Sequence, residues 1–429
     1  MMSDITSPQT ATPERAPGKD KIIGGARFLS TFFLANAAMY GVFQGMQQIL
    51  LPSQIAAIDP VGKVVSYGIL ASIGALVAAV GNPLFGSLSD RTRSRFGRRS
   101  PWLLISAIVA ALGMVAMAGM NELFWLGAAY LLVMMTMSAY QAVISAVMPD
   151  RVPESRRGLV SSIAGLATAL GVIYGITVTP AFAEKPFLGY LILGLVLVVA
   201  AVLIVTLSPD PTAADTSVPP RRTGSLLQSF KGFFSGLADH DFAWAFWARF
   251  VIMVGFWTVS TYQLYALSDY IGVENIPGGS VAGGVALLGI LNLGGSVITT
   301  VISGPLSDKL GRRKIFVVVA SLGIGAGALI PAIWPTWGGM VAYSLVVGFF
   351  FGIYTAVDQA IMTLVLPHSE NNARDLGLLN VATTGPQISG PFIAALIITV
   401  TGGYAPLFIF CAIFAVAGAF LILPIRRVR

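Results

Sequence analysis

Twelve long apolar stretches constrain the fold of this 429-residue chain more than any other feature. Each is close to the ~20 residues that an α-helix needs to cross a bilayer, and hydrophobic residues outnumber charged ones, at 55% against 10%. Membrane-barrel strands would alternate polar and apolar residues, which these stretches do not. The sequence therefore predicts an all-α membrane protein with twelve transmembrane helices. The predicted helices span about 25–51, 63–88, 100–120, 123–148, 158–183, 186–207, 243–268, 280–306, 314–333, 338–366, 375–401 and 404–425.

A duplicated loop indicates that these helices form two related halves. The segment that begins at Gly86 returns in shorter form from Gly304, 218 positions later. A second pair of similar segments, 141–149 and 359–367, keeps the same offset. Two different motifs that share one offset indicate an internal repeat. We therefore expect two pseudo-symmetric six-helix bundles.

The repeat and the composition together predict four regions. Residues 1–22 are polar and are expected to form a flexible cytoplasmic tail. The two six-helix bundles are predicted at 23–207 and 243–429. A cytoplasmic linker rich in proline, 208–242, is expected to join them.

The placement of lysine and arginine predicts the orientation in the membrane. If the N-terminus is cytoplasmic, the outer loops hold only Lys63 and Lys185, and nearly all other basic residues fall on inner loops or tails. This is the positive-inside pattern, and it predicts a multi-pass protein of the plasma (inner) membrane with both termini cytoplasmic. We interpret the net charge of +7 as a consequence of the basic residues on the inner loops, which set the topology and contact acidic membrane lipid. No basic groove with interleaved aromatic residues indicates nucleic-acid binding.

The sequence offers little support for enzymatic chemistry. Cys411 is the only cysteine, and the two histidines, His240 and His368, stand far apart without cysteine neighbours. A metal site is therefore not expected. No glycine-rich phosphate loop, nucleophile elbow or metalloprotease motif is present. We expect no enzyme activity, no cofactor and no bound metal.

The duplicated loop itself has two interpretations. An aspartate ends the preceding apolar stretch in each copy, and arginines precede the next stretch, so a carboxylate can pair with an arginine or with a helix N-terminus. One interpretation is a conformational gate that latches the two halves together in one state. The other is a positively charged topology anchor without a moving part. The candidate gate residues are Asp90, Arg91, Arg98, Asp308 and Arg312.

The first loop copy carries a family resemblance. Its pattern, Gly-x-Leu-Ser-Asp-Arg-x-x-x-Arg-x-Gly-Arg-Arg from Gly86 to Arg99, resembles the signature loop of the major facilitator superfamily. The longer version that runs from Ser89 to Trp102 resembles the glycoside–pentoside–hexuronide symporters, and among them the proton-linked sucrose transporters. The resemblance implies alternating access, in which two halves rock about a central site lined by helices 1, 4, 7 and 10.

Polar residues at helical spacing predict where a water-filled cavity lies. A side chain that faces lipid should be apolar, so a polar stripe marks another kind of surface. Amides and hydroxyls that donate and accept hydrogen bonds suit a sugar, and aromatic faces cover its C–H surface. The alternative is hydrogen bonding that holds the helices together. The candidate substrate-binding residues are Asn36, Tyr40, Gln44, Gln47, Tyr140, Gln141, Trp257, Tyr262, Gln263, Tyr354, Gln359, Asn380 and Gln387.

Asp358 is the single acidic residue deep inside a predicted helix, in the stretch 338–366. An ionised carboxylate there costs roughly 2.5–3.5 kcal/mol on insertion scales, so it needs a role. One hypothesis makes Asp358 and Arg249 the proton-coupling pair, and the other makes them a structural ion pair. The repeat places Tyr140 opposite Asp358, so helix 4 lacks the acid found in the sucrose carriers. Sodium coupling is disfavoured, and uniport stays open.

These observations predict a secondary active transporter for a sugar or glycoside, with protons as the candidate coupling ion, acting as a monomer. An exporter of drugs or hydrophobic metabolites on the same scaffold is the nearest alternative. The exporter alternative is supported by three methionines and one aromatic residue, because such side chains suit apolar ligands. These residues are Met134, Met135, Met137 and Trp257.

Overall fold

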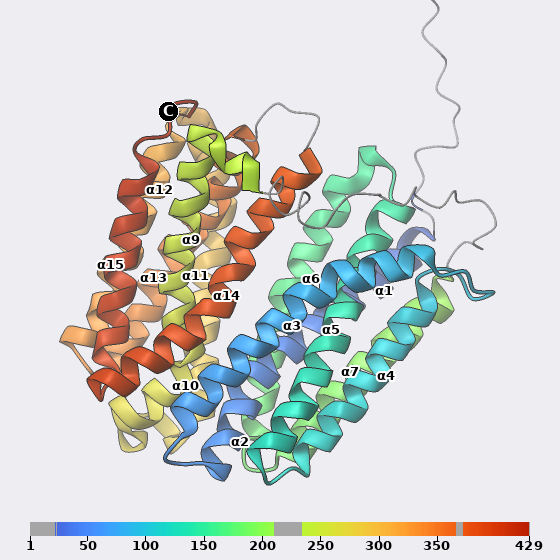
Figure 1. The fold of residues 1–429 in the computed structure, drawn as a ribbon, viewed down its shortest axis with the longest axis horizontal. Coiled ribbons are helices and arrows are strands. Elements are labelled where there is room, and N and C mark those ends of the chain that lie inside the picture. Colours follow the sequence, from blue (N-terminus) through green and yellow to red (C-terminus); the bar gives the residue numbers. More distant parts are fainter. Residues whose placement is uncertain (1–21, 23, 210–233, 366–371, 429) are drawn as a thin grey trace, which may run out of the picture.

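The computed structural model describes residues 22, 24–209, 234–365 and 372–428. The predicted tail, apart from Ile22, and the middle of the predicted linker at 210–233 lie outside this part of the chain. Figure 1 shows the described residues as helices in two groups, α1–α7 and α9–α15, with the C-terminus at the end away from α2 and α10.

The helices follow the predicted apolar stretches closely, with boundaries that differ by a few residues. The first group consists of α1 (Gly25–Gly45), the π-helix η1 (Met46–Leu50), α2 (Leu51–Ile58), α3 (Lys63–Arg91), α4 (Ser100–Ala118), α5 (Leu123–Arg151), η2 (Glu154–Arg156), α6 (Arg157–Val178), η3 (Thr179–Phe182) and α7 (Pro186–Leu207). The second group consists of η5 (Phe234–Ala238), α9 (His240–Thr261), α10 (Gln263–Tyr265), the π-helix η6 (Ala266–Gly272), η7 (Val273–Asn275), η8 (Pro277–Gly279), α11 (Val281–Leu310), α12 (Arg313–Ile333), α13 (Trp337–Val365), α14 (Asn372–Thr401) and α15 (Ala405–Ile422).

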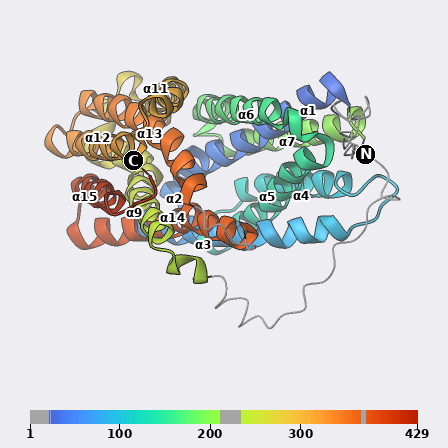
Figure 2. The same ribbon diagram turned by 90° about the horizontal axis from the view of Figure 1, so that it is seen from above.

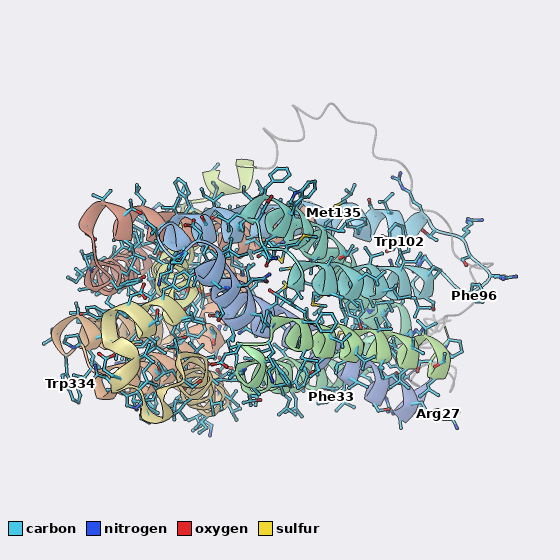
Figure 3. All side chains as sticks on the ribbon, turned by 90° about the horizontal axis from the view of Figure 1, so that it is seen from below. Arg27, Phe33, Phe96, Trp102, Met135 and Trp334 are labelled. Carbon is cyan, nitrogen blue, oxygen red and sulfur yellow. The ribbon has the colours of Figure 1, made fainter. Side chains whose placement is uncertain are left out.

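Within the described residues, eleven helices are long and apolar enough to cross a membrane. The remaining predicted stretch, 25–51, corresponds to α1, η1 and α2, where a π-turn interrupts the α-helix. Large apolar side chains also cover the outer surface: Met135 and Trp334, which are 42% and 53% exposed, lie at the periphery in Figure 3. Such a surface suits lipid and not water. The predicted all-α membrane fold is confirmed.

Glycines allow the helices of each group to approach closely. A Cβ at Gly171 of α6 would overlap the Ala37 carbonyl of α1, and one at Gly175 would overlap the Gly41 carbonyl. In the second group, a Cβ at Gly348 of α13 would overlap the Asn292 backbone of α11. Small residues at such crossings are the usual means of helix association in lipid, where burial against a neighbour offers no hydrophobic gain.

Two related pairs of long helices connect the two groups. α3 packs against α14, and α6 packs against α11. Shifting α3 by 218 positions places its first residue, Lys63, on Val281, the first residue of α11. The same shift places Glu154, the start of η2 before α6, on Asn372, the start of α14. The two contacts are therefore counterparts under the repeat, and Figure 2 shows α14 beside α3.

We name the two ends of the bundle by their loops. The arginine-rich end carries the segment 92–99 between α3 and α4, where Phe96 is exposed and projects beyond the helices (Figure 3). The opposite end carries the segment 59–62 between α2 and α3. Both π-helices, η1 and η6, lie toward the opposite end. π-turns inside α-helices occur frequently at functional sites.

Candidate functional site

A cavity of about 450 Å³ lies between the two groups of helices. This volume falls in the range of roughly 300–1,000 Å³ that is usual for small-molecule sites. α1, η1, α3, α5 and α6 form its wall in the first group, and α9 and α14 form its wall in the second. The cavity is lined by Tyr40, Phe43, Gln44, Gln47, Gln48, Tyr67, Ala71, Ala75, Ala78, Ala79, Asn82, Met134, Gln141, Thr168, Val172, Trp257, Thr261, Asn380, Thr383, Thr384, Gln387 and Pro391.

Seven of the thirteen candidate substrate-binding residues meet at this cavity. These seven residues come from both groups of helices. The two that are farthest apart in the sequence, Tyr40 and Gln387, are separated by 347 positions. The structure therefore brings distant polar stripes onto one surface. The seven residues are Tyr40, Gln44, Gln47, Gln141, Trp257, Asn380 and Gln387.

The other six candidates do not line this cavity, and two of them are engaged in hydrogen bonds to backbone carbonyls. The Asn36 amide donates to the Phe32 carbonyl of its own helix at 2.8 Å. The buried Tyr140 hydroxyl donates to the Ala35 carbonyl at 3.4 Å. The remaining four lie elsewhere: Tyr262 at the opposite end, Gln263 in α10, Tyr354 beside Asp358, and Gln359 on the exposed face of α13.

The helices that line the cavity differ from those that the resemblance implied. α13, the tenth predicted helix, contributes no residue to the lining described here, because its polar residues Tyr354 and Asp358 face Arg249 of α9. α3, α6 and α14 contribute instead. Helices 1, 4 and 7 do take part, through α1, α5 and α9. Helix 10 thus contributes none of its described residues to the lining of this cavity, and its role in transport stays a prediction.

Several lining residues are not among the candidates predicted from the sequence. Gln48 adjoins Gln47 in η1, and its Oε1 atom is buried with no hydrogen-bond partner among the described residues. Asn82 is the one amide side chain in α3. Thr168 and Thr383 also line the cavity. Threonine has a short side chain and is common in membrane helices, so its presence in the sequence does not indicate a cavity. An amide isolated within an apolar span is the signal that points to Asn82, because lipid-facing positions exclude it.

Three tyrosines pack together beside the cavity, and Tyr67 is the one that lines it. We call Tyr67, Tyr262 and Tyr265 the tyrosine seal. The Tyr67 ring lies 5.6 Å from each of the other two rings, with edge-to-face geometry. The Tyr262 hydroxyl donates to the Val64 carbonyl at 2.6 Å, and the Tyr265 hydroxyl donates to the Pro52 carbonyl at 2.8 Å. These contacts join residues of the second group to α2 and α3 of the first.

An ion pair reinforces the seal. Lys63 Nζ lies 2.8 Å from Asp269 Oδ1, and the Tyr404 hydroxyl donates to Asp269 Oδ2 at 2.7 Å. Partial burial raises the pKa of the Asp269 carboxyl, but hydrogen bonds from Lys63, Ser268 and Tyr404 outweigh it and hold this pKa below its ordinary value. Within the described residues, the hydrogen bonds and ion pairs between the two groups lie at this end.

Arg249 and Asp358 form a buried ion pair outside the cavity. Arg249 Nε lies 2.6 Å from Asp358 Oδ2, and a second guanidinium nitrogen lies 2.5 Å from the same oxygen. Both side chains are 7% exposed. The pair joins α9 to α13 within the second group. A buried pair of this kind tolerates the loss of one partner poorly, because a single charge then stays buried.

The arginine-rich loops form ion pairs within each group of helices. Asp90 pairs with Arg99 at 2.6 Å, and Asp150 pairs with both Arg98 and Arg99, at 2.8 and 3.0 Å. In the second copy, Asp308 pairs with Arg313 at 2.6 Å. The partners of the two aspartates are thus Arg99 and Arg313. The candidate gate residues Arg91 and Arg312 are exposed. A latch between the halves stays a prediction.

The fold and the cavity define a polytopic membrane protein with a substrate-sized chamber between two related helical bundles. A family model described as Major Facilitator Superfamily matches residues 22–303 and 279–429. The chain belongs to the major facilitator superfamily. The signature-loop resemblance is confirmed at this level.

Individual relatives are distant. The MFS transporter asaE of Aspergillus flavus is 25% identical over 182 residues, 42% of this chain and 40% of that protein. The lactose permease of Lactobacillus delbrueckii subsp. bulgaricus is 25% identical over 298 residues, 63% of this chain and 45% of that protein. The matched part thus spans less than half the length of either relative. The nucleoside transporter NupG has a similar fold, with a TM-score of 0.73 at 12% identity, covering 93% of this chain and 99% of that one.

Proposed function

We infer that this member of the superfamily is a secondary active transporter that moves a sugar or glycoside by alternating access. The observation that carries this proposal is the cavity of about 450 Å³ between the helical groups, lined by amides, hydroxyls and Trp257. Amide and hydroxyl groups donate and accept as sugar hydroxyls do, and an indole face suits the C–H surface of a sugar ring. The similarity to a lactose permease and the resemblance of the first loop to glycoside–pentoside–hexuronide symporters both support a sugar.

The positive-inside rule supports an orientation in which the arginine-rich end and both termini face the cytoplasm of a plasma (inner) membrane. The tyrosine seal then closes the external side. We propose that the structure represents the state in which the cavity is reached from the cytoplasm, and that the bundles 23–207 and 243–429 rock about it. The protein is proposed to act as a monomer, because one chain supplies both walls of the cavity.

Proton coupling is a separate part of the proposal. Asp358 and Arg249 are its candidates, and protonation of Asp358 would act by releasing Arg249, since the pair lies outside the cavity lining. Uniport is the second candidate. It is favoured by the fact that no Asp or Glu stands among the lining residues given above.

Uptake of a labelled sugar panel into proteoliposomes tests the function. Wild-type protein should take up at least one sugar or glycoside, and Gln387→Leu should lower the apparent affinity by up to about tenfold, because one neutral hydrogen bond is lost. Gln359→Leu is the matched control, since Gln359 lies on the exposed face of α13. If only hydrophobic drugs were moved, the exporter alternative would replace this proposal.

The same vesicles test coupling. An imposed pH gradient should drive accumulation by wild-type protein, and Asp358→Asn should abolish it, with sugar exchange in the same vesicles as the check that the variant is folded. Accumulation that persists in Asp358→Asn would rule out the coupling role. If the pH gradient has no effect on sugar uptake by the wild-type protein, the protein is a uniporter.

A further inference from the structure

The lining of the cavity carries no formal charge. None of the described residues that line it is an Asp, Glu, Lys, Arg or His. Of the charged groups at the tyrosine seal and between α9 and α13, Lys63 pairs with Asp269 and Arg249 pairs with Asp358. A charged ligand would therefore leave water without a partner of opposite charge, which is unfavourable.

Six of the seven amide side chains in the lining come from α1, η1, α5 and α14, and the seventh is Asn82 of α3. Gln44, Gln47 and Gln48 come from α1 and η1, Gln141 comes from α5, and α14 supplies a further set. The buried Gln48 Oε1 has no hydrogen-bond partner within the described part of the chain. The α14 set consists of Asn380, Thr383, Thr384 and Gln387.

On α3, four alanines form an apolar surface between the polar lining residues Tyr67 and Asn82. Ala71, Ala75, Ala78 and Ala79 line the cavity at steps of four, three and one, which places them on one helical face. We call these four residues the alanine wall. At 1.5 Å per residue, the wall is about 12 Å long. A neighbouring face of α3 packs on α5, where a Cβ at Gly74 would lie 2.6 Å from the Tyr130 ring. This packing holds α3 in the orientation in which the four alanines face the cavity.

We propose that the cavity takes an uncharged glycoside that carries an apolar aglycone. The sugar hydroxyls bind the amides of η1, α5 and α14, and the aglycone packs on the alanine wall. This assignment rests on the proposed function and narrows it, because it excludes uronides and sugar phosphates and favours aryl over methyl glycosides. The small side chain of Ala75 makes room for the aglycone, so Ala75 determines specificity.

Microcalorimetry on the purified full-length protein tests the assignment with defined probes: phenyl and methyl glycosides of glucose, galactose and xylose, and phenyl glucuronide. For the sugar that binds best, the phenyl glycoside should bind about tenfold or more tightly than the methyl glycoside. Phenyl glucuronide should bind at least about tenfold more weakly than phenyl glucoside. Equal affinity in either comparison overturns this inference and leaves sugar transport standing. No binding of any glycoside overturns the proposed function itself.

Variants of the wall complete the test. Ala75→Leu should cancel the preference for the phenyl glycoside, a change of about tenfold, with a smaller effect on the methyl glycoside. Ala128→Leu is the matched control, because Ala128 is exposed on α5, and it should keep the wild-type ratio. If Ala75→Leu does not fold, Ala75→Ser adds polarity at nearly constant volume and should reduce the same ratio. A phenyl-to-methyl ratio that neither Ala75 variant changes contradicts the role of the wall.

Discussion

Lys63 and Asp269 join the two helical groups at the opposite end, with Nζ 2.8 Å from Oδ1. They stand 206 positions apart and lie on α3 and η6. Lys63 also lies 5.1 Å from the centre of the Tyr265 ring, so the ion pair and the tyrosine seal form one contact region. If the bundles rock, this region must separate in each cycle.

Breaking this ion pair should favour opening at the opposite end. Asp269→Asn should shift the equilibrium by about 1 kcal/mol, because the pair is partly exposed and such pairs are weak. The charge swap Lys63→Asp with Asp269→Lys should restore part of the contact. The measurement is the labelling rate of a cysteine placed at Gln47, in a Cys411→Ala background, by an impermeant reagent added from that end. Equal rates in wild type and Asp269→Asn would contradict this role.

The contribution of Asp269 to the stability of the folded protein should be lost only at acidic pH. Its folded-state pKa lies below the ordinary value, so its contribution to stability is complete above the unfolded pKa of about 3.9. It is lost as the pH falls through the folded pKa. The difference in Tm between wild type and Asp269→Asn should therefore stay constant from about pH 8 to 5, begin to shrink near about pH 4, and vanish only once the pH is below the folded-state pKa. A difference that changes between pH 8 and 5 would show that another group is responsible.

Removing one partner of the Arg249–Asp358 pair should strongly lower the stability of the folded protein. Asp358→Asn leaves the Arg249 charge buried and should lower the free energy of unfolding by about 3–5 kcal/mol. The double variant Arg249→Met with Asp358→Leu removes both charges and should be nearer to wild type, since apolar replacements of buried pairs are often tolerated. Thermal unfolding in detergent measures both. A double variant less stable than Asp358→Asn would contradict this account.

Arg99 should matter more to stability than Arg91. The Arg99 side chain is 5% exposed and binds Asp90, Asp150 and Ser89. Arg99→Gln should lower the free energy of unfolding by roughly 1.5–3 kcal/mol, because hydrogen bonds to charged groups are lost. Arg91→Gln is the matched control at an exposed position and should stay within about 0.5 kcal/mol of wild type. Equal effects of the two changes would refute the distinction.

The fold was largely predictable from the sequence, because a bilayer admits few solutions for runs of apolar residues. The helix boundaries and the repeat offset needed no contact information. The interruption of the first helix by η1 was not predictable, since Met46–Leu50 is as apolar as its neighbours apart from Gln47 and Gln48. A π-turn depends on tertiary contacts, such as the hydrogen bond from the Tyr67 hydroxyl to the Gln47 carbonyl.

The cavity was predictable only in part. Polar stripes on the first and eleventh predicted helices identified Gln44, Gln47, Asn380 and Gln387 because lipid excludes amides from those positions. The same rule does not distinguish a cavity from a buried contact, and Tyr262 illustrates this, since its hydroxyl joins the seal. The alanine wall gave no sequence signal, because alanine suits lipid, protein and cavity surfaces equally. Only the packing of α3 on α5 and α14 separates these cases.

Access to a single cysteine from each side of the membrane tests the central claim most directly. In a Cys411→Ala background, Thr384→Cys places the label on the α14 wall of the cavity. An impermeant maleimide should react from the arginine-rich side and not from the opposite side, and Lys63→Ala should increase the reaction from the opposite side. Equal labelling from both sides in the otherwise unchanged protein, or from neither side, would contradict a chamber that opens to one side at a time.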